Sequence, residues 1–201
     1  MWVKICGVRT VEQALWAERC GADAVGLNLH APSARSISVD LAAEIAGAVS
    51  VESVLVLVDR TADQLVDLVA AISPSSLQLH GRVTPAHTAW LGVPAFRAFR
   101  AHRDVEAEIR AWAPDRFLLD AHVLGKAGGT GQRVDEALAH RCRGLGSMIL
   151  AGGLRPDNVA DAIAAVAPWG VDVASGVEHE PGRQDPDRVR AFIEAARGQN
   201  G

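Results

Sequence analysis

The sequence predicts an α/β protein in which eight strand–helix units close into a single (β/α)8 barrel over residues 1–201. Short runs rich in Val, Ile and Leu alternate with longer Ala-rich stretches of helical period, and no linker or change of composition separates the units. Strands that alternate with helices pair in parallel through right-handed crossovers. Runs that are apolar on both faces suit a sheet that is covered on both faces.

Each expected element follows from its local pattern. The strands are the short apolar runs Trp2 to Cys6, Ala24 to Leu29, Ser53 to Val58, Ser76 to Leu79, Ala95 to Phe99, Arg116 to Leu119, Met148 to Ala151 and Val171 to Ala174. The helices follow in turn over Val11 to Cys20, Val39 to Val49, Ala62 to Ile72, a segment starting near Pro85, Asp104 to Trp112, Asp135 to Arg143, Pro156 to Val166 and Asp187 to Arg197. Thr10, Ser38 and Thr61 stand where an N-cap is expected, and Pro85 suits a first helical turn.

Eight such units indicate that the sheet closes into a barrel. A length of 201 residues fits the small end of the size range of TIM barrels. The competing architecture is an open doubly wound sheet. That fold normally uses fewer strands in a chain of this length, so the sequence favours the barrel.

Composition excludes several classes of protein. With a net charge of −4, the chain lacks the excess of basic residues that is typical of nucleic-acid-binding proteins. Its apolar runs are too short to span a membrane. The start of the chain is no signal peptide, since Gly7 and Arg9 interrupt its apolar stretch. The three cysteines have no metal-ligand spacing, and their odd number makes a disulfide framework unexpected. This favours a reducing compartment. We expect a cytoplasmic protein.

Catalytic groups of a (β/α)8 barrel lie where strands end and helices begin. Cys6 ends the first expected strand; most free cysteines are small buried apolar residues, but this position favours a function. A thiol becomes a useful base when nearby positive charge lowers its pKa from about 8.5. Asp120 follows three apolar residues, a setting that favours a general acid over an N-cap or an arginine partner. Cys20 and Cys142 fall near helix ends and are weaker candidates.

Two short glycine motifs follow the seventh and eighth strands. Loops at these two places often form a phosphate site, because glycines let the backbone approach the ligand and unpaired N–H groups donate to an anion. The alternative is that the glycines merely turn the chain. Two motifs at consecutive strand ends favour phosphate binding. The predicted phosphate-binding residues are Gly152, Gly153, Ser175 and Gly176.

Other candidates are less specific. Gly128, Gly129, Thr130 and Gly131 follow the sixth strand and form a phosphate-binding loop, a mobile lid or an ordinary surface loop. Arg35 is a candidate for holding a substrate carboxylate, although most such arginines are simply solvated. His80 is a candidate for orienting substrate, with a structural histidine as the alternative. His30, His80 and His122 lie near strand ends but have no short-spaced ligand pair, so we expect no metal.

A set of short motifs, taken in order and spacing, resembles the phosphoribosylanthranilate isomerase family of tryptophan biosynthesis over essentially the whole chain. The motifs are Lys4 to Gly7, Gly21 to Gly26, Ser33 to Arg35, Leu77 to Gly81, Leu118 to Asp120, Gly128 to Gly131, Ala151 to Asn158 and Val171 to Glu178, completed by Gly182 and Asp185. The stretch from Gly26 to Arg35 departs from the family pattern, since many members carry aromatic residues and a lysine there.

The resemblance implies a (β/α)8 barrel that performs an Amadori rearrangement of an aminoaldose phosphate, without a cofactor, as a monomer or a homodimer. It implies Cys6 as general base, Asp120 as general acid, Arg35 beside the anthranilate carboxylate, and Gly152, Gly153, Ser175 and Gly176 around the phosphate. Two alternatives are another phosphosugar isomerase or epimerase and a non-catalytic barrel that binds phosphate ligands. The first would need an aspartate in place of Cys6 or metal ligands at several strand ends, and the presence of both Cys6 and Asp120 argues against the second.

Overall fold

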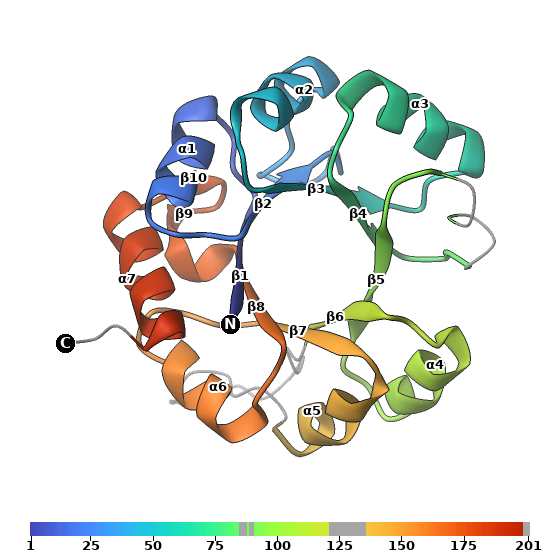
Figure 1. Cartoon of the computed structure of the whole chain (residues 1–201), viewed down its shortest axis with the longest axis vertical. Coiled ribbons are helices and arrows are strands. Elements are labelled where there is room, and N and C mark those ends of the chain that lie inside the picture. Colours follow the sequence, from blue (N-terminus) through green and yellow to red (C-terminus); the bar gives the residue numbers. More distant parts are fainter. Residues whose placement is uncertain (85–87, 89–90, 121–135, 199–201) are drawn as a thin grey trace.

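The computed structural model, which describes residues 1–84, 88, 91–120 and 136–198, confirms a closed barrel of eight parallel strands in the order β1 to β8. The open doubly wound sheet is therefore wrong. Viewed down the barrel, the strands form an inner ring and the helices an outer one (Figure 1). The strands are β1 Trp2–Cys6, β2 Ala24–Asn28, β3 Glu52–Val58, β4 Ser76–His80, β5 Ala95–Arg100, β6 Arg116–Asp120, β7 Ser147–Ala151 and β8 Gly170–Val173.

The helices agree with the expected ones to within a few residues. They are α1 Val11–Arg19, α2 Val39–Ala48, α3 Ala62–Ile72, α4 Val105–Trp112, α5 Glu136–Cys142, α6 Val159–Val166 and α7 Pro186–Arg197, with short 3-10 turns η2 Arg143–Leu145 and η3 Ser175–Val177. The hydroxyls of Thr10, Ser38 and Thr61 each accept a backbone N–H of the helix that follows, as predicted. The helix expected near Pro85 lies outside the described residues. No helix in the described part of the chain is long and apolar enough to cross a membrane.

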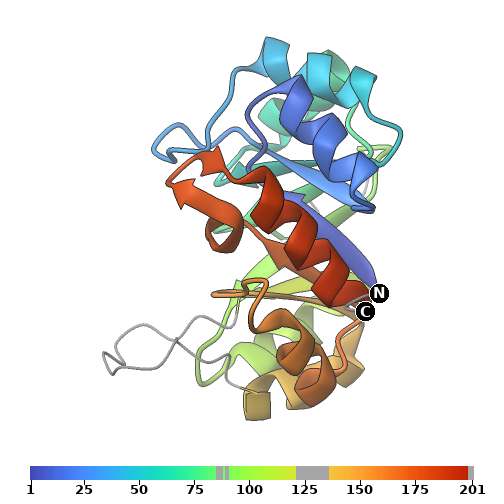
Figure 2. The ribbon, with the colours of Figure 1, turned by 90° about the vertical axis from the view of Figure 1, so that its left-hand side faces the viewer.

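A short hairpin between β8 and α7 was not predicted. It pairs β9 Glu178–Glu180 with β10 Arg183–Gln184 in antiparallel fashion. The Pro181-Gly182 dipeptide between them is a turn signal, but the strands are too short and polar to show an apolar pattern. Figure 2 shows the hairpin at one end of the barrel, and the N-terminus and the end of α7 at the other.

Three helices end in the same way. Ser73, Ala113 and Ala167 follow α3, α4 and α6 in the left-handed conformation, with φ of 52°, 49° and 49°. A proline comes next in each case; it cannot continue the helix and disfavours the right-handed helical conformation in the residue before it. The following strand begins three residues after the left-handed residue each time. The same turn thus leads into β4, β6 and β8.

The core has two parts. A large apolar layer fills the space between the strands and the helices, and a small cluster fills part of the barrel interior. The interior cluster consists of Ala24, Val54, Phe96, Leu118, Ile149 and Ala151. The barrel also buries charged and polar side chains, among them Lys4, Gln78 and Asp172. Burying a polar group lowers the stability of the fold unless the group has a hydrogen-bond partner. The partners of these three side chains are therefore described with the site.

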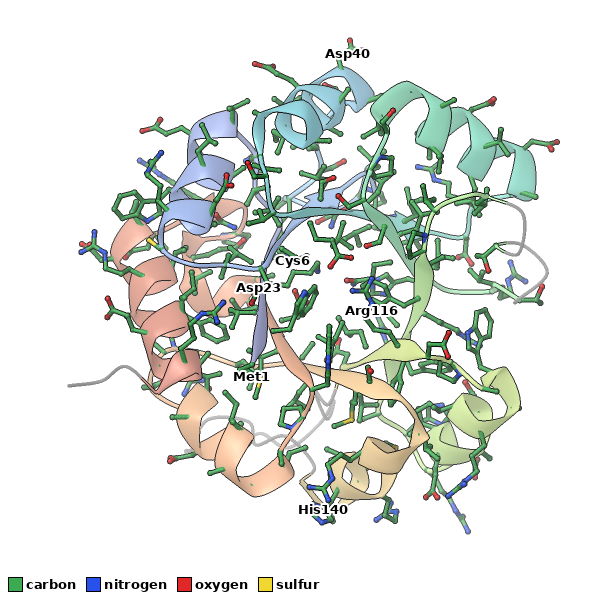
Figure 3. All side chains as sticks on the ribbon, viewed as in Figure 1. Met1, Cys6, Asp23, Asp40, Arg116 and His140 are labelled. Carbon is green, nitrogen blue, oxygen red and sulfur yellow. The ribbon has the colours of Figure 1, made fainter. Side chains whose placement is uncertain are left out.

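The end of the barrel where the strands begin is closed by one arginine. The Arg116 guanidinium lies 4.5 Å from the centre of the Phe96 ring and donates to both carboxylate oxygens of Glu52, at 2.8 and 3.1 Å. It also faces Trp2 and Trp169, which stack on each other with ring centres 5.3 Å apart. Figure 3 shows Arg116 inside the ring of strands. Aromatic packing and the ion pair between Arg116 and Glu52 therefore stabilise this end of the barrel.

We predict that Arg116→Met lowers the free energy of unfolding by about 2 kcal/mol, because it leaves a half-buried carboxylate unpaired. Urea denaturation followed by tryptophan fluorescence measures the loss. The double variant Glu52→Gln/Arg116→Met removes both charges and should recover most of it. A wild-type urea midpoint for Arg116→Met would show that the ion pair contributes nothing.

Candidate active site

The candidate residues lie at the end of the barrel where the strands finish. Cys6 is the last residue of β1 and Asp120 the last residue of β6, and β7 and β8 separate these strands on one side of the ring. The order around the rim is His80 on β4, Asp120 on β6, Gly152 and Gly153 after β7, Ser175 and Gly176 after β8, Cys6 on β1, and Arg35 after β2. The two glycine motifs therefore stand between the thiol and the carboxyl group.

The loops after β7 and β8 pack tightly against each other. Gly152 and Gly153 have φ of 94° and 71°, a left-handed region that favours glycine. The Asn158 amide donates to the Gly153 carbonyl at 3.0 Å and fixes this loop. A Cβ on Gly176 would collide with the Leu154 carbonyl, so only glycine fits there. The packing leaves the short turn η3, which starts at Ser175, beside the β7 loop.

The Cys6 side chain lies in a space that a glycine leaves open. Cys6 is 8% exposed, and a Cβ on Gly26 of the neighbouring strand would come within 2.7 Å of the Cys6 sulfur and 3.1 Å of Lys4 Cε. Gly26 thus lets the thiol and the lysine stem lie against β2. Figure 3 shows Cys6 on β1 beside the barrel interior.

A chain of hydrogen bonds starts directly below Cys6. The fully buried Lys4 ammonium donates to Asp172 Oδ1 at 2.8 Å and to Gln78 Oε1 at 2.9 Å. Because the oxygen of Gln78 is used by Lys4, its amide nitrogen faces His80 Nε2 at 2.8 Å. An amide nitrogen only donates, so the network assigns an acceptor role to His80 Nε2 and places the ring proton on Nδ1. The side chain of His80 is therefore oriented by Gln78.

Burial and charge act against each other on these groups. Burial raises the pKa of Cys6, and Asp172 adds to this, whereas the positive charges of Lys4 and Arg35 lower it; the net direction is upward. The expected positive charge is therefore present, but it does not outweigh burial. Burial alone would lower the pKa of Lys4, but Asp172 and Cys6 raise it above its usual value, so the ammonium stays charged. Burial lowers the pKa of His80 to about 4, with smaller contributions from other cations, so this ring is neutral near pH 7.

Arg35 is engaged by a carboxylate of the chain itself. Its Nε and Nη2 donate to the two oxygens of Glu178, at 2.7 and 2.6 Å, in a bidentate pair. The hydrogen bonds to Glu178 raise the pKa of Arg35 further. The remaining nitrogen, Nη1, donates to no residue among those described. Arg35 is thus held rigidly between the β2 loop and β9, with one nitrogen left for another acceptor.

The β9–β10 hairpin fastens this side of the rim. The buried Gln184 amide donates to the Cys6 carbonyl at 3.1 Å, and Arg9 donates to the Gly182 carbonyl at 3.4 Å. Sequence reasoning did not single out Gln184. It also passed over Lys4 and Asp172 as functional residues and noted Gln78 only for its place near a strand end, although a polar residue inside an apolar strand must find a partner when buried. That signal could have identified all three.

Other rim residues have structural partners. Asn28 Oδ1 accepts the His30 N–H at 2.8 Å, and Asp59 Oδ1 accepts the Arg82 N–H at 2.8 Å, so both organise loops. A pocket beside β4 and β5 is lined by His30, His80, Arg97, Arg100, His102 and Glu108, and its charge is mainly positive. In the described part of the chain, no group of three or more His, Cys, Asp and Glu side chains could hold a metal. Gly128 to Gly131 and His122 lie outside the described residues.

Comparison with known proteins gives a consistent result. The family model "N-(5'phosphoribosyl)anthranilate (PRA) isomerase" matches residues 3–195. An N-(5'-phosphoribosyl)anthranilate isomerase of Citrifermentans bemidjiense is 42% identical over 207 residues, which cover 97% of this chain and 96% of that protein.

Two solved structures are similar over their whole length. Phosphoribosyl anthranilate isomerase of Thermotoga maritima has a TM-score of 0.88 and 33% identity, and the match covers 98% of this chain and 99% of that one. A phosphoribosyl anthranilate isomerase in complex with reduced 1-(o-carboxyphenylamino)-1-deoxyribulose 5-phosphate has a TM-score of 0.85 and 32% identity, with the same coverage.

We predict that Gly176→Ala weakens binding of inorganic phosphate about tenfold, which is about 1.4 kcal/mol. The added methyl group forces the β8 loop away from the Leu154 carbonyl and opens the glycine-lined space. Phosphate that binds the native state raises the melting temperature, so thermal unfolding across a phosphate titration gives the affinity. Gly47→Ala is the matched control, because a Cβ there meets nothing within 4 Å. Equal phosphate affinity in both variants would contradict the prediction.

Proposed function

Because the chain belongs to the N-(5'-phosphoribosyl)anthranilate isomerase family, we propose that it catalyses the Amadori rearrangement of tryptophan biosynthesis with Cys6 as general base and Asp120 as general acid. The protein is an enzyme, an isomerase. The substrate is N-(5'-phosphoribosyl)anthranilate, an aminoaldose phosphate. The product is the aminoketose 1-(2-carboxyphenylamino)-1-deoxyribulose 5-phosphate.

The observation that carries the proposal is the order of groups around the rim. The two glycine loops stand between β1 and β6, so a phosphate bound there would have Cys6 on one side and Asp120 on the other. Backbone N–H groups of a helical turn are a ready site for an anion. With the phosphate as anchor, the sugar attached to it extends between the thiol and the carboxyl group. The rest of the rim is left for the aromatic ring.

The reaction begins with an acid. The Asp120 carboxylic acid donates its proton to the ring oxygen of the ribose, the bond between C1 and that oxygen breaks, and the nitrogen lone pair forms the C=N bond of a Schiff base. Asp120 is left as a carboxylate. General acid catalysis of this kind contributes about 10²- to 10⁴-fold, provided that the acid is within hydrogen-bond reach of the oxygen.

The second step needs a base that faces C2 of the sugar. The Cys6 thiolate takes the C2 proton, the electrons of that bond form a C1=C2 double bond, and the iminium nitrogen accepts the displaced pair. The resulting enolamine then tautomerises to the ketone. The iminium is itself the electron sink, so the chemistry uses only proton transfers.

The carboxylate of the anthranilate group needs a cationic partner. Arg35 supplies one through Nη1, because Glu178 fixes the guanidinium through the other two nitrogens. His80 offers a neutral donor, since Gln78 occupies its Nε2 and leaves Nδ1–H available. These two residues would orient the aromatic end of the substrate while the glycine loops hold the phosphate.

We expect Cys6→Ser and Asp120→Asn each to lower kcat by at least about a hundredfold, the scale of general acid–base catalysis. Loss of substrate fluorescence as the sugar rearranges measures turnover, and circular dichroism checks that the barrel is intact. Cys20→Ser makes a thiol-to-hydroxyl change away from the rim and should keep wild-type activity. Wild-type rates in both rim variants would exclude the assignment.

The pH dependence of kcat/KM provides a separate prediction. Cys6 must lose its proton to act as a base, and burial raises its pKa above the ordinary cysteine value of about 8.5. Above about pH 7 the substrate phosphate is fully ionised, and His80, with a pKa of about 4, no longer titrates. In Asp120→Asn, where no carboxyl group has to stay protonated, we therefore expect the residual kcat/KM to rise about tenfold per pH unit from about pH 7 to beyond about pH 8.5. A flat profile of this variant over that range, measured by steady-state assay, would argue against a thiol base.

A further inference from the structure

We propose that Lys4 is a positioning residue for the isomerisation, whose buried ammonium, held in place by Asp172 and Gln78, favours the thiolate form of Cys6. This inference rests on the proposed role of Cys6 as the base. Lys4 lies two residues before Cys6 on β1, so both side chains point into the barrel, with the lysine one layer below the thiol.

The position of Lys4 is not explained by stability alone. Taking a lysine and an aspartate out of water is expensive, and an apolar pair of similar size is often as stable or more stable. Lys4 is fully buried, yet it keeps its charge through Asp172 Oδ1 at 2.8 Å. The ion pair therefore calls for a role other than packing, and the group next to it is the Cys6 sulfur.

Three observations connect Lys4 to Cys6. The two side chains border the same space over Gly26, where a Cβ would meet both the Cys6 sulfur and Lys4 Cε. The positive charge of Lys4 lowers the pKa of the Cys6 thiol and so favours its charged form. Its bonds to Asp172 and Gln78, on opposite sides of β1 around the ring, fix the ammonium in the middle of the barrel.

The need for such a charge follows from the substrate. The sugar brings a phosphate and a carboxylate to the rim, and both disfavour a second anion nearby. Among the described residues, the charges that act on Cys6 come from Lys4, Asp172 on β8 and Arg35 after β2, whereas Glu52 on β3 and His80 on β4 interact with Lys4. Arg35 is paired with Glu178 and His80 is neutral, and Lys4 is the one cation that is fully buried among the described residues.

The test measures the thiol directly and needs no turnover. In a Cys20→Ser/Cys142→Ala background Cys6 is the sole cysteine, and the chain has no tyrosine, so the ultraviolet absorbance change on raising the pH reports the Cys6 thiolate alone. The key variant is Lys4→Met/Asp172→Asn, which removes both charges and leaves no unpaired carboxylate. We expect its thiol pKa to rise by at least about one unit, and, when Asp120→Asn is added, the rising limb of kcat/KM against pH to move by the same amount.

A matched control separates this effect from a general loss of stability. Glu52→Gln/Arg116→Met removes an ion pair at the opposite end of the barrel and should leave the thiol pKa unchanged. If Lys4→Met/Asp172→Asn does not fold, Lys4→Gln/Asp172→Asn keeps a hydrogen-bonding side chain and gives the same readout. An unchanged thiol pKa in the folded Lys4 variant would overturn the proposal.

The outcomes also distinguish the two proposals. If Cys6 is not the base, Cys6→Ser keeps its activity while the absorbance titration still reports the effect of Lys4 on the thiol; the positioning role in catalysis then falls with the base. If Cys6 is the base and Lys4 has only a structural role, Cys6→Ser is inactive and the Lys4 variant loses thermal stability at an unchanged thiol pKa.

Discussion

Closure of the sheet by the pairing of β1 with β8 is the constraint on which the rest of the structure depends. This parallel pairing sets Lys4 opposite Asp172 and so places a cation and its counter-charge at the same level of the barrel. It also brings the loop after β8 beside the end of β1, where Cys6 lies. Because all eight strands run in one direction, every group at a strand end faces the same rim. The site is thus a consequence of how the ring closes.

The two ends of the barrel interior use charge for different purposes. Where the strands begin, Arg116 and Glu52 pair beneath aromatic rings, and the pair holds strands together. Nearer the other end, Lys4 and Asp172 pair next to a thiol and a histidine at the rim. The first pair is partly exposed and can be replaced by apolar packing. The second pair is deeply buried, so its two charges carry a large desolvation cost. An effect on the neighbouring thiol and histidine gives a reason to keep it.

The sequence was enough to predict the strands, most of the helices and the rim residues, because apolar runs, caps such as Thr61 and strand ends are local patterns. What it could not supply is pairing across the ring. Nothing local connects Lys4 with Asp172, or Arg35 with Glu178, since register between distant strands decides both. The β9–β10 hairpin was not predicted for a different reason: its strands are too short and too polar to show an alternating apolar pattern. Only the Pro-Gly turn marked it.

The partners of Lys4, Cys6 and Arg35 come from the far end of the chain. Asp172, Gln184 and Glu178 lie 168, 178 and 143 residues beyond the groups that they hold. During synthesis on the ribosome, the first quarter of the protein therefore emerges long before anything can orient its thiol or its arginine. A product truncated before β8 would contain Lys4, Cys6 and Arg35 without the groups that hold them.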